Sequence, residues 1–152
     1  MTNNDGKPAL RFPAMLVDLG GTIDEVREGY ARGTLPLSEM VMQPSRVFHA
    51  GAIITLADEV ASAAIVGQVG DPTETAGKLF PYSIQISTNL LSNDPEGPIK
   101  AEAKVVKRGR IVVVDTEVTG SKGQVVALMR STHAMVDPKT TGPHKKEFFK
   151  AK

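Results

Sequence analysis

The chain contains no cysteine, and only three of its 152 residues are histidine. The lack of cysteine excludes disulfides, Cys-ligated zinc or iron–sulfur sites and thiol nucleophiles, and it fits a reducing compartment. His49, His133 and His144 stand far apart in the sequence. Because no metal-ligand spacing is evident, we expect no metal site.

An excess of charge of one sign is also missing, because 18 basic residues are balanced by 17 acidic ones. This balance argues against a nucleic-acid-binding protein that works by counterion release.

The most apolar segment, 50–66, contains Asp58 and Glu59, whereas a membrane span needs about 20 apolar residues. The first residues lack the pattern of a signal peptide. We therefore expect a soluble, cytoplasmic protein.

The secondary structure is expected to be one long helix followed by four strands. Alanine-rich spacing of apolar residues at three and four predicts a helix over Ala50–Gln68 that is apolar on nearly every side. Period-two alternation then predicts strands near 82–90, 99–105, 111–119 and 124–136, with turns at 93–97 and 120–123. These elements indicate an α+β domain with an antiparallel sheet curled around the helix.

The first 38 residues are expected to form an N-terminal segment with one short helix. Thr22 and Glu25 have the spacing of a capping box, which predicts a helix over 23–32. Alternation at Met40 and Met42 predicts a short edge strand within 39–48. The main domain should then span 39–136, and the polar, lysine-rich residues 137–152 should form a tail.

Several enzyme classes lack their signatures here, since the sequence has no G-x-S-x-G elbow, Walker A loop, H-E-x-x-H helix or dinucleotide G-x-G-x-x-G. Asp58 stands out instead, because it lies inside an apolar helix and should be partly shielded from water. It is either a catalytic acid or a helix acid stabilised by the dipole. His49 precedes this helix, whose Ala50 and Gly51 N–H groups suit an anion or oxyanion. The alternative for His49 is a capping or packing role.

These residues resemble a known family. His49-Ala50-Gly51 followed by Asp58, nine positions after the histidine, resembles the H-G-G and acid pattern of hot-dog-fold acyl-CoA thioesterases of the phenylacetic-acid-degradation (PaaI-like) type. The resemblance continues through 101–103, 108–110, 117–118 and 123–127, and so covers roughly residues 40–136. It implies a hot-dog fold and hydrolysis of an acyl-CoA thioester to a free acid and coenzyme A, which is part of the substrate and not a cofactor.

The resemblance also implies roles for single residues. Asp58 would be the nucleophile or the general base, and the Ala50 N–H, with that of Gly51, would form the oxyanion hole. The remaining catalytic positions implied are His49, Gln43, Ser62 and Ser83. Those implied to bind substrate or coenzyme A are Arg46, Lys107, Arg108, Gly109 and Arg110. Ala50 replaces the first glycine of H-G-G, and Arg46 stands where many relatives have glycine.

Hot-dog thioesterases of this type pair edge to edge as dimers, often doubled to tetramers, with the active site at the interface. We therefore expect an obligate homo-oligomer in which His49 of one chain faces Asp58 of the other. The alternatives are a hot-dog hydratase or dehydratase and a non-catalytic acyl-CoA-binding module. An acyl-CoA-responsive regulator would need a DNA-binding helix-turn-helix, for which the N-terminal residues offer only one helix.

Overall fold

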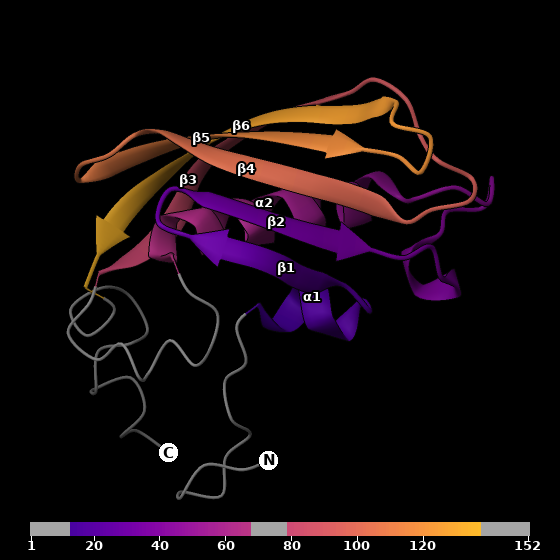
Figure 1. The fold of residues 1–152 in the computed structure, drawn as a ribbon, viewed down its shortest axis with the longest axis horizontal. Helices are drawn as coiled ribbons and strands as arrows, with labels where there is room; N and C mark the ends of the chain where they lie inside the picture. Colours follow the sequence, from indigo (N-terminus) through magenta and orange to yellow (C-terminus); the bar gives the residue numbers. More distant parts are fainter. Residues whose placement is uncertain (1–12, 68–78, 138–152) are drawn as a thin grey trace, which may run out of the picture.

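One antiparallel sheet and one long helix define the architecture (Figure 1). The computed structural model describes residues 13–67 and 79–137. The elements are α1 (Ala14–Asp18), β1 (Thr22–Arg27), β2 (Tyr30–Leu35), a 3-10 turn at Glu39–Val41, α2 (Ala50–Val66), β3 (Phe80–Leu90), β4 (Ile99–Lys107), β5 (Ile111–Thr119) and β6 (Val125–Val136). The strand order is β1-β2-β4-β5-β6-β3.

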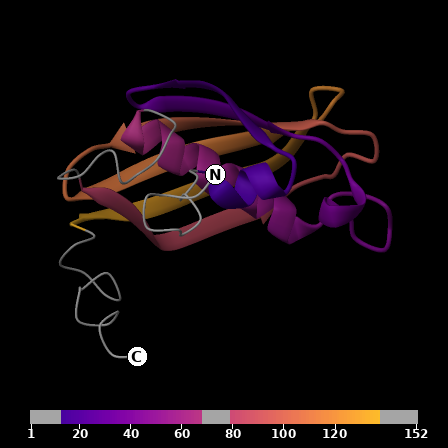
Figure 2. The same cartoon turned by 90° about the horizontal axis from the view of Figure 1, so that it is seen from below.

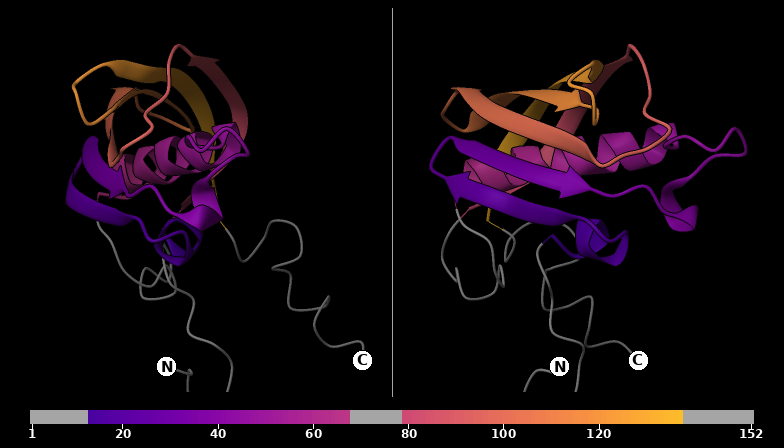
Figure 3. Two further views of the ribbon diagram at one scale, coloured as in Figure 1. Left: turned by 90° about the vertical axis from the view of Figure 1, so that its right-hand side faces the viewer. Right: turned by 45° about the vertical axis from the view of Figure 1, so that its right-hand side comes forward.

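The sheet curves around α2, which lies across one of its faces (Figures 2 and 3). All neighbouring strands run antiparallel. The predicted α+β class is therefore confirmed, as are the four strands expected after the helix. The expected tail after 137 lies outside the described residues, so it stays a prediction.

The helix α2 forms as its apolar spacing predicts, and both of its ends are capped. His49 is the N-cap, and its ring accepts a hydrogen bond from the Gly51 N–H. Gly67 adopts a left-handed conformation with φ 73°, and its N–H bonds the Ala63 carbonyl, which ends the helix. Ten of its 17 residues are buried. Because most of the helix surface is covered by the rest of the protein, few of its positions need a polar side chain.

The predicted helix over 23–32 is wrong: these residues form the hairpin of β1 and β2. A bulge between Ile23 and Glu25 interrupts the period-two alternation of β1. The inward positions of β2 include the small residues Ala31 and Gly33, which give a weak hydrophobic signal. The sheet thus begins at Thr22, ahead of residue 39, and the short helix of this region is α1 instead.

Gly33 shows how closely the layers pack at this hairpin. A Cβ added there would lie 2.7 Å from both the Thr22 carbonyl oxygen and Val60 Cγ2. Val60 belongs to α2, so the glycine lets helix and strand approach each other directly.

The short strand expected within 39–48 is also wrong, since Glu39–Val41 is a 3-10 turn and only Met42 and Phe48 form an isolated bridge.

A buried carboxylate joins two of the sheet's connections. Asp94 lies between β3 and β4 and accepts hydrogen bonds from the N–H groups of Glu96, Gly97 and Ser121, the last in the β5–β6 hairpin. Burial opposes ionisation, but these donors outweigh it and hold the pKa of Asp94 well below its usual range. The two loops beside the N-terminal end of α2 are therefore tied together.

Candidate active site

Asp58 contacts the edge strand of the sheet. It lies near the middle of α2 and is half-buried, as its apolar flanks predict. Its Oδ1 accepts a hydrogen bond of 2.9 Å from the Ser83 hydroxyl on β3. Two of the residues singled out in the sequence, 25 positions apart, are thus brought together by the packing of α2 against β3.

A β-bulge points Ser83 toward the helix. Ser83 pairs with His133, whereas Gln85 pairs with Thr132, so β3 carries one extra residue at Ile84. Because side chains alternate between the two faces of a sheet, the extra residue reverses which positions face α2. Ser83 therefore faces α2 beside the buried His133, while Gln85 faces the other way beside Thr132.

His133 extends this contact into the core, although no sequence pattern assigned it a role in the site. Its Nδ1 lies 3.3 Å from the Ser83 hydroxyl, and its Nε2 lies 2.8 Å from the Ser131 hydroxyl. Both His133 and Ser131 are fully buried. Burial lowers the pKa of His133, although the nearby Asp58 charge raises it in part. The sequence could have singled out His133 only through its position on the inner face of β6, and that position is known only once the strand pairing is known.

Glu59, the residue next to Asp58, has a raised pKa. Burial raises the pKa of Glu59 to about 7, and the Asp58 charge adds to this effect. Glu59 lies about 100° around the helix from Asp58. Its side chain therefore points away from the Ser83 contact.

The first turn of α2 presents one free donor. The Gly51 N–H is engaged by His49 Nδ1 at 2.9 Å. No described group accepts a hydrogen bond from the Ala50 N–H. Ala50 adopts a negative φ, so an alanine fits where the family has glycine. Of the two donors expected, that of Ala50 is the one available to a ligand at the positive end of the helix dipole.

The loop before α2 holds Gln43 and Arg46. The Gln43 side-chain amide donates to the Ser45 hydroxyl at 2.8 Å, and among the described residues no hydrogen bond joins Gln43 to Asp58. Arg46 is exposed and has φ 63°, a left-handed conformation that glycine adopts more easily. Ser62, one turn after Asp58, is buried.

One chain does not bring all the expected site residues together. His49 and Asp58 are nine residues apart, which along a helix is about 13 Å. Lys107, Arg108, Gly109 and Arg110 are exposed at the β4–β5 turn. That turn lies near the opposite end of α2, because the Gly29 N–H bonds the Ala64 carbonyl of α2 while the Gly29 carbonyl accepts from the Val105 N–H, near the end of β4. Arg108 forms an ion pair of 3.8 Å with Glu28 there.

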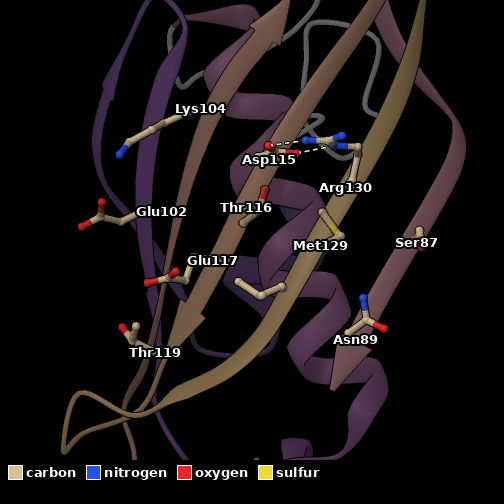
Figure 4. A pocket seen from close by; sticks show the side chains of 11 residues that line it. Ser87, Asn89, Glu102, Lys104, Asp115, Thr116, Glu117, Thr119, Met129 and Arg130 are labelled. Atoms are coloured by element: carbon tan, nitrogen blue, oxygen red, sulfur yellow. Dashed lines mark hydrogen bonds and ion pairs between the residues drawn. The ribbon is translucent and has the colours of Figure 1, made fainter. Parts of the chain in front are cut away.

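A hollow of about 570 Å³ lies on the other face of the sheet (Figure 4). Its walls include Glu102 and Lys104, which alternate with buried residues that face α2. Arg130 and Asp115, which are cross-strand partners and also line it, form a two-bond ion pair with distances of 2.6 and 2.7 Å. The hollow is separated from Asp58 by the sheet, so it is not part of the candidate site.

Within residues 13–67 and 79–137, no group of three or more acidic or histidine side chains has the arrangement of a metal site. In the same part of the chain, no helix has the length and hydrophobicity to cross a membrane.

The chain was compared with known proteins. No protein-family model matches it. A curated Bacillus subtilis (strain 168) protein, named "Putative esterase ComA2", is 26% identical over 123 residues, which are 80% of this chain and 94% of that protein. Its similarity therefore spans nearly the whole length of the relative.

Several solved structures with the same fold are thioesterases by name. A Staphylococcus aureus thioesterase has a TM-score of 0.73, is 23% identical and covers 82% of this chain and 99% of its own. The Escherichia coli PaaI protein of the phenylacetic acid degradation operon has a TM-score of 0.68, 23% identity and coverage of 80% and 88%. A hypothetical thioesterase of Streptococcus pneumoniae, solved with coenzyme A, has a TM-score of 0.65, 20% identity and coverage of 76% and 89%. The chain therefore has the hot-dog fold, as the sequence resemblance implies.

Proposed function

We propose that the protein hydrolyses an acyl-CoA thioester to a free carboxylic acid and coenzyme A. The observation that carries the proposal is the half-buried Asp58 carboxylate, held by Ser83 in the middle of the long helix of a hot-dog fold. The similar proteins support it, because several of the solved ones are named thioesterases and one of these was solved with coenzyme A. The esterase relative supports the hydrolytic class.

Asp58 supplies the chemistry in this proposal through its second oxygen. Ser83 occupies Oδ1, which leaves Oδ2 for the thioester carbonyl carbon or for a water molecule. As a nucleophile, Oδ2 forms a mixed anhydride while the C–S bond breaks and the thiolate of coenzyme A leaves; water then cleaves the anhydride and restores the carboxylate. As a general base, Asp58 takes a proton from the attacking water and the thiolate accepts a proton as it leaves.

The Ala50 N–H completes the proposed site as the oxyanion donor. It lies at the N-terminus of α2, where the helix dipole stabilises the negative charge that develops on the thioester oxygen. His49 contributes by holding the Gly51 N–H and so the shape of this first turn. Because Ala50 and Asp58 are about 12 Å apart along one helix, this donor must come from a second protomer.

A homodimer formed through β3 meets that requirement. β3 is an edge of the sheet, and its unpaired backbone groups invite another strand. Ile84, Ile86 and Leu90 on β3 are 58%, 41% and 46% exposed, although the sequence pattern predicts a half-buried strand. A second copy paired at this edge covers them and brings the start of one α2 toward Asp58 of the other. The assembly is a homodimer or a dimer of such dimers.

The same pairing accounts for the basic residues proposed to bind coenzyme A. Arg46 and the segment Lys107–Arg110 lie near opposite ends of α2, which is 17 residues or about 25 Å long. They therefore meet one ligand only if they belong to different protomers. Arginine suits the phosphates of coenzyme A because its planar guanidinium binds two oxygens at once.

The test is free-thiol release from a panel of aryl- and alkyl-CoA thioesters, with enoyl-CoA included to detect hydration and an oxygen ester as a control. We expect thiol release from at least one thioester and no hydration of the enoyl-CoA. Binding of coenzyme A without turnover of any thioester would indicate a binding module instead. Hydration without thiol release would indicate a hydratase.

A further inference from the structure

We propose that His133 is a positioning residue that acts through Ser83 to fix the orientation of the Asp58 carboxylate. The inference rests on the proposed function, because it assigns a partner to the proposed catalytic acid. It goes beyond the sequence resemblance, which assigns nothing to His133. The structure supplies a continuous chain of hydrogen bonds from the core to the acid.

With a neutral His133 ring and an ionised Asp58, the donors in this chain can be arranged in only one consistent direction. Ser83 has one hydroxyl proton, and it donates that proton to Asp58 Oδ1. The Ser83 oxygen must therefore accept its second bond from His133 Nδ1–H. His133 Nε2 then carries no proton in the neutral ring and accepts from the Ser131 hydroxyl. Burial lowers the pKa of His133, which favours this neutral form.

Ser131 and His133 are buried polar residues in otherwise apolar surroundings. On β6 the inward residues before it are the apolar Ala127 and Met129, and the strand partners on β5 are Val112 and Val114. A fully buried imidazole loses its hydration, and two apolar side chains would avoid that cost. Both ring nitrogens of His133 are used, one toward Ser131 and one toward Ser83. Ser131 and His133 therefore form a line of hydrogen bonds that leads through Ser83 to Asp58.

His133 fixes a hydroxyl that would otherwise rotate. Ser83 lies on an edge strand and is exposed, so its hydroxyl has three staggered orientations available. The bond from His133 Nδ1–H leaves the Ser83 proton directed at Asp58 Oδ1. The carboxylate is then held by one oxygen, with Oδ2 turned toward the substrate. A misplaced reacting group slows a step without weakening substrate binding.

Two amide substitutions at position 133 separate positioning from simple packing. In His133→Asn the side-chain nitrogen takes the place of Nδ1 and keeps the donor to Ser83, whereas in His133→Gln it takes the place of Nε2 and keeps only the Ser131 bond. We expect His133→Gln and His133→Phe to lower kcat about 10- to 100-fold with KM nearly unchanged. His133→Asn should stay within about fivefold of the wild type, although glutamine is closer to histidine in size.

Ser83→Ala provides the coupling test at an exposed position that leaves the core intact. It should lower kcat as much as His133→Gln does, and the double variant should be no slower than either single one, because the two residues act in one chain. Thr116→Val is the matched control, since it removes a buried hydroxyl on β5 with no hydrogen-bond partner among the described residues. Its kcat should stay within about twofold. Additive losses, or equal kcat in the asparagine and glutamine variants, would overturn the proposal.

A readout independent of activity is the tautomer of His133, measured by long-range ¹H–¹⁵N NMR on the full chain at neutral pH. We expect a neutral ring with the proton on Nδ1. A proton on Nε2 would refute the chain of hydrogen bonds. If the wild type hydrolyses no thioester but His133 carries its proton on Nδ1, the proposed function fails and the arrangement around Asp58 stands.

Discussion

At the residue scale, two adjacent acids on α2 have different surroundings. Asp58 has a hydroxyl donor on one oxygen, and Glu59 has burial without a hydrogen bond from any described group, which raises its pKa to about 7. The sequence singled out Asp58 because of its apolar neighbours and the spacing from His49. It missed His133, because the role of that residue depends on a bulge and a strand register that alternation does not reveal.

Glu59→Gln tests the electrostatics of this pair through stability. The folded-state pKa of Glu59, about 7, is above its ordinary value of 4.5. The folded protein therefore binds this proton more tightly, and stability is lost as the pH rises from about 4.5 to 7. Glutamine removes that loss, so the variant should be more stable than the wild type at pH 8 by about 1 to 2 kcal/mol, allowing for partial exposure.

The measurement is chemical denaturation of both proteins at pH 8 and at pH 4.5. The stabilisation by glutamine should disappear at the lower pH, where the wild-type side chain is itself neutral. A difference that does not change with pH would mean that Glu59 titrates normally. Equal stability at pH 8 would also contradict the raised pKa.

At the scale of elements, the helix α2 and strands β3 to β6 follow from periodicity, and β1 and β2 do not. The capping-box spacing of Thr22 and Glu25 suggested a helix, but the bulge in β1 and the small inward residues of β2 hid the alternation of a hairpin. Pairing of β1 with β2, and of β2 with β4, stabilises the hairpin although the local sequence favours a helix. The N-terminus of α2, in contrast, has the capped first turn that His49 and Gly51 suggest.

Ala50→Pro tests the proposed oxyanion donor without disturbing the helix. Ala50 is the first helical residue, where proline is well tolerated, and proline lacks the N–H in question. His49 already has φ −65° and ψ 138°, which a following proline permits. We expect kcat to fall about 10²- to 10³-fold.

The control for Ala50→Pro is its melting temperature, which should stay within a few degrees of the wild type because the helix keeps its hydrogen bonds. Ala50→Gly, which keeps the N–H, should retain most activity. Full activity in Ala50→Pro would remove this N–H from the mechanism.

At the scale of the whole molecule, the fold separates the two halves of the proposed site along one helix. The sheet edge at β3 and its exposed apolar side chains supply the means of bringing them together. The sequence resemblance implies such a pairing, whereas periodicity alone could not place it, because an edge strand that pairs with a second copy has the same alternation as an internal strand.

Mixing two inactive variants tests the shared site. Ala50→Pro and Asp58→Asn, unfolded and refolded together in equal amounts, should give half heterodimers, each with one intact site. The expected activity is about one quarter of the wild type. Each variant refolded alone is the control. No recovery in a mixture shown to contain heterodimers would place both groups in the same protomer.

The role proposed for Asp58 as the working acid is decided by kcat for thioester hydrolysis in Asp58→Asn, measured beside Glu59→Gln. Both variants change a carboxylate to an amide of nearly the same shape at neighbouring positions of α2. We predict a loss of at least about a hundredfold, or 2.7 kcal/mol of transition-state stabilisation, in a folded Asp58→Asn. Glu59→Gln should stay within about threefold. Near-normal turnover by Asp58→Asn, or a large loss in Glu59→Gln alone, would contradict the claim.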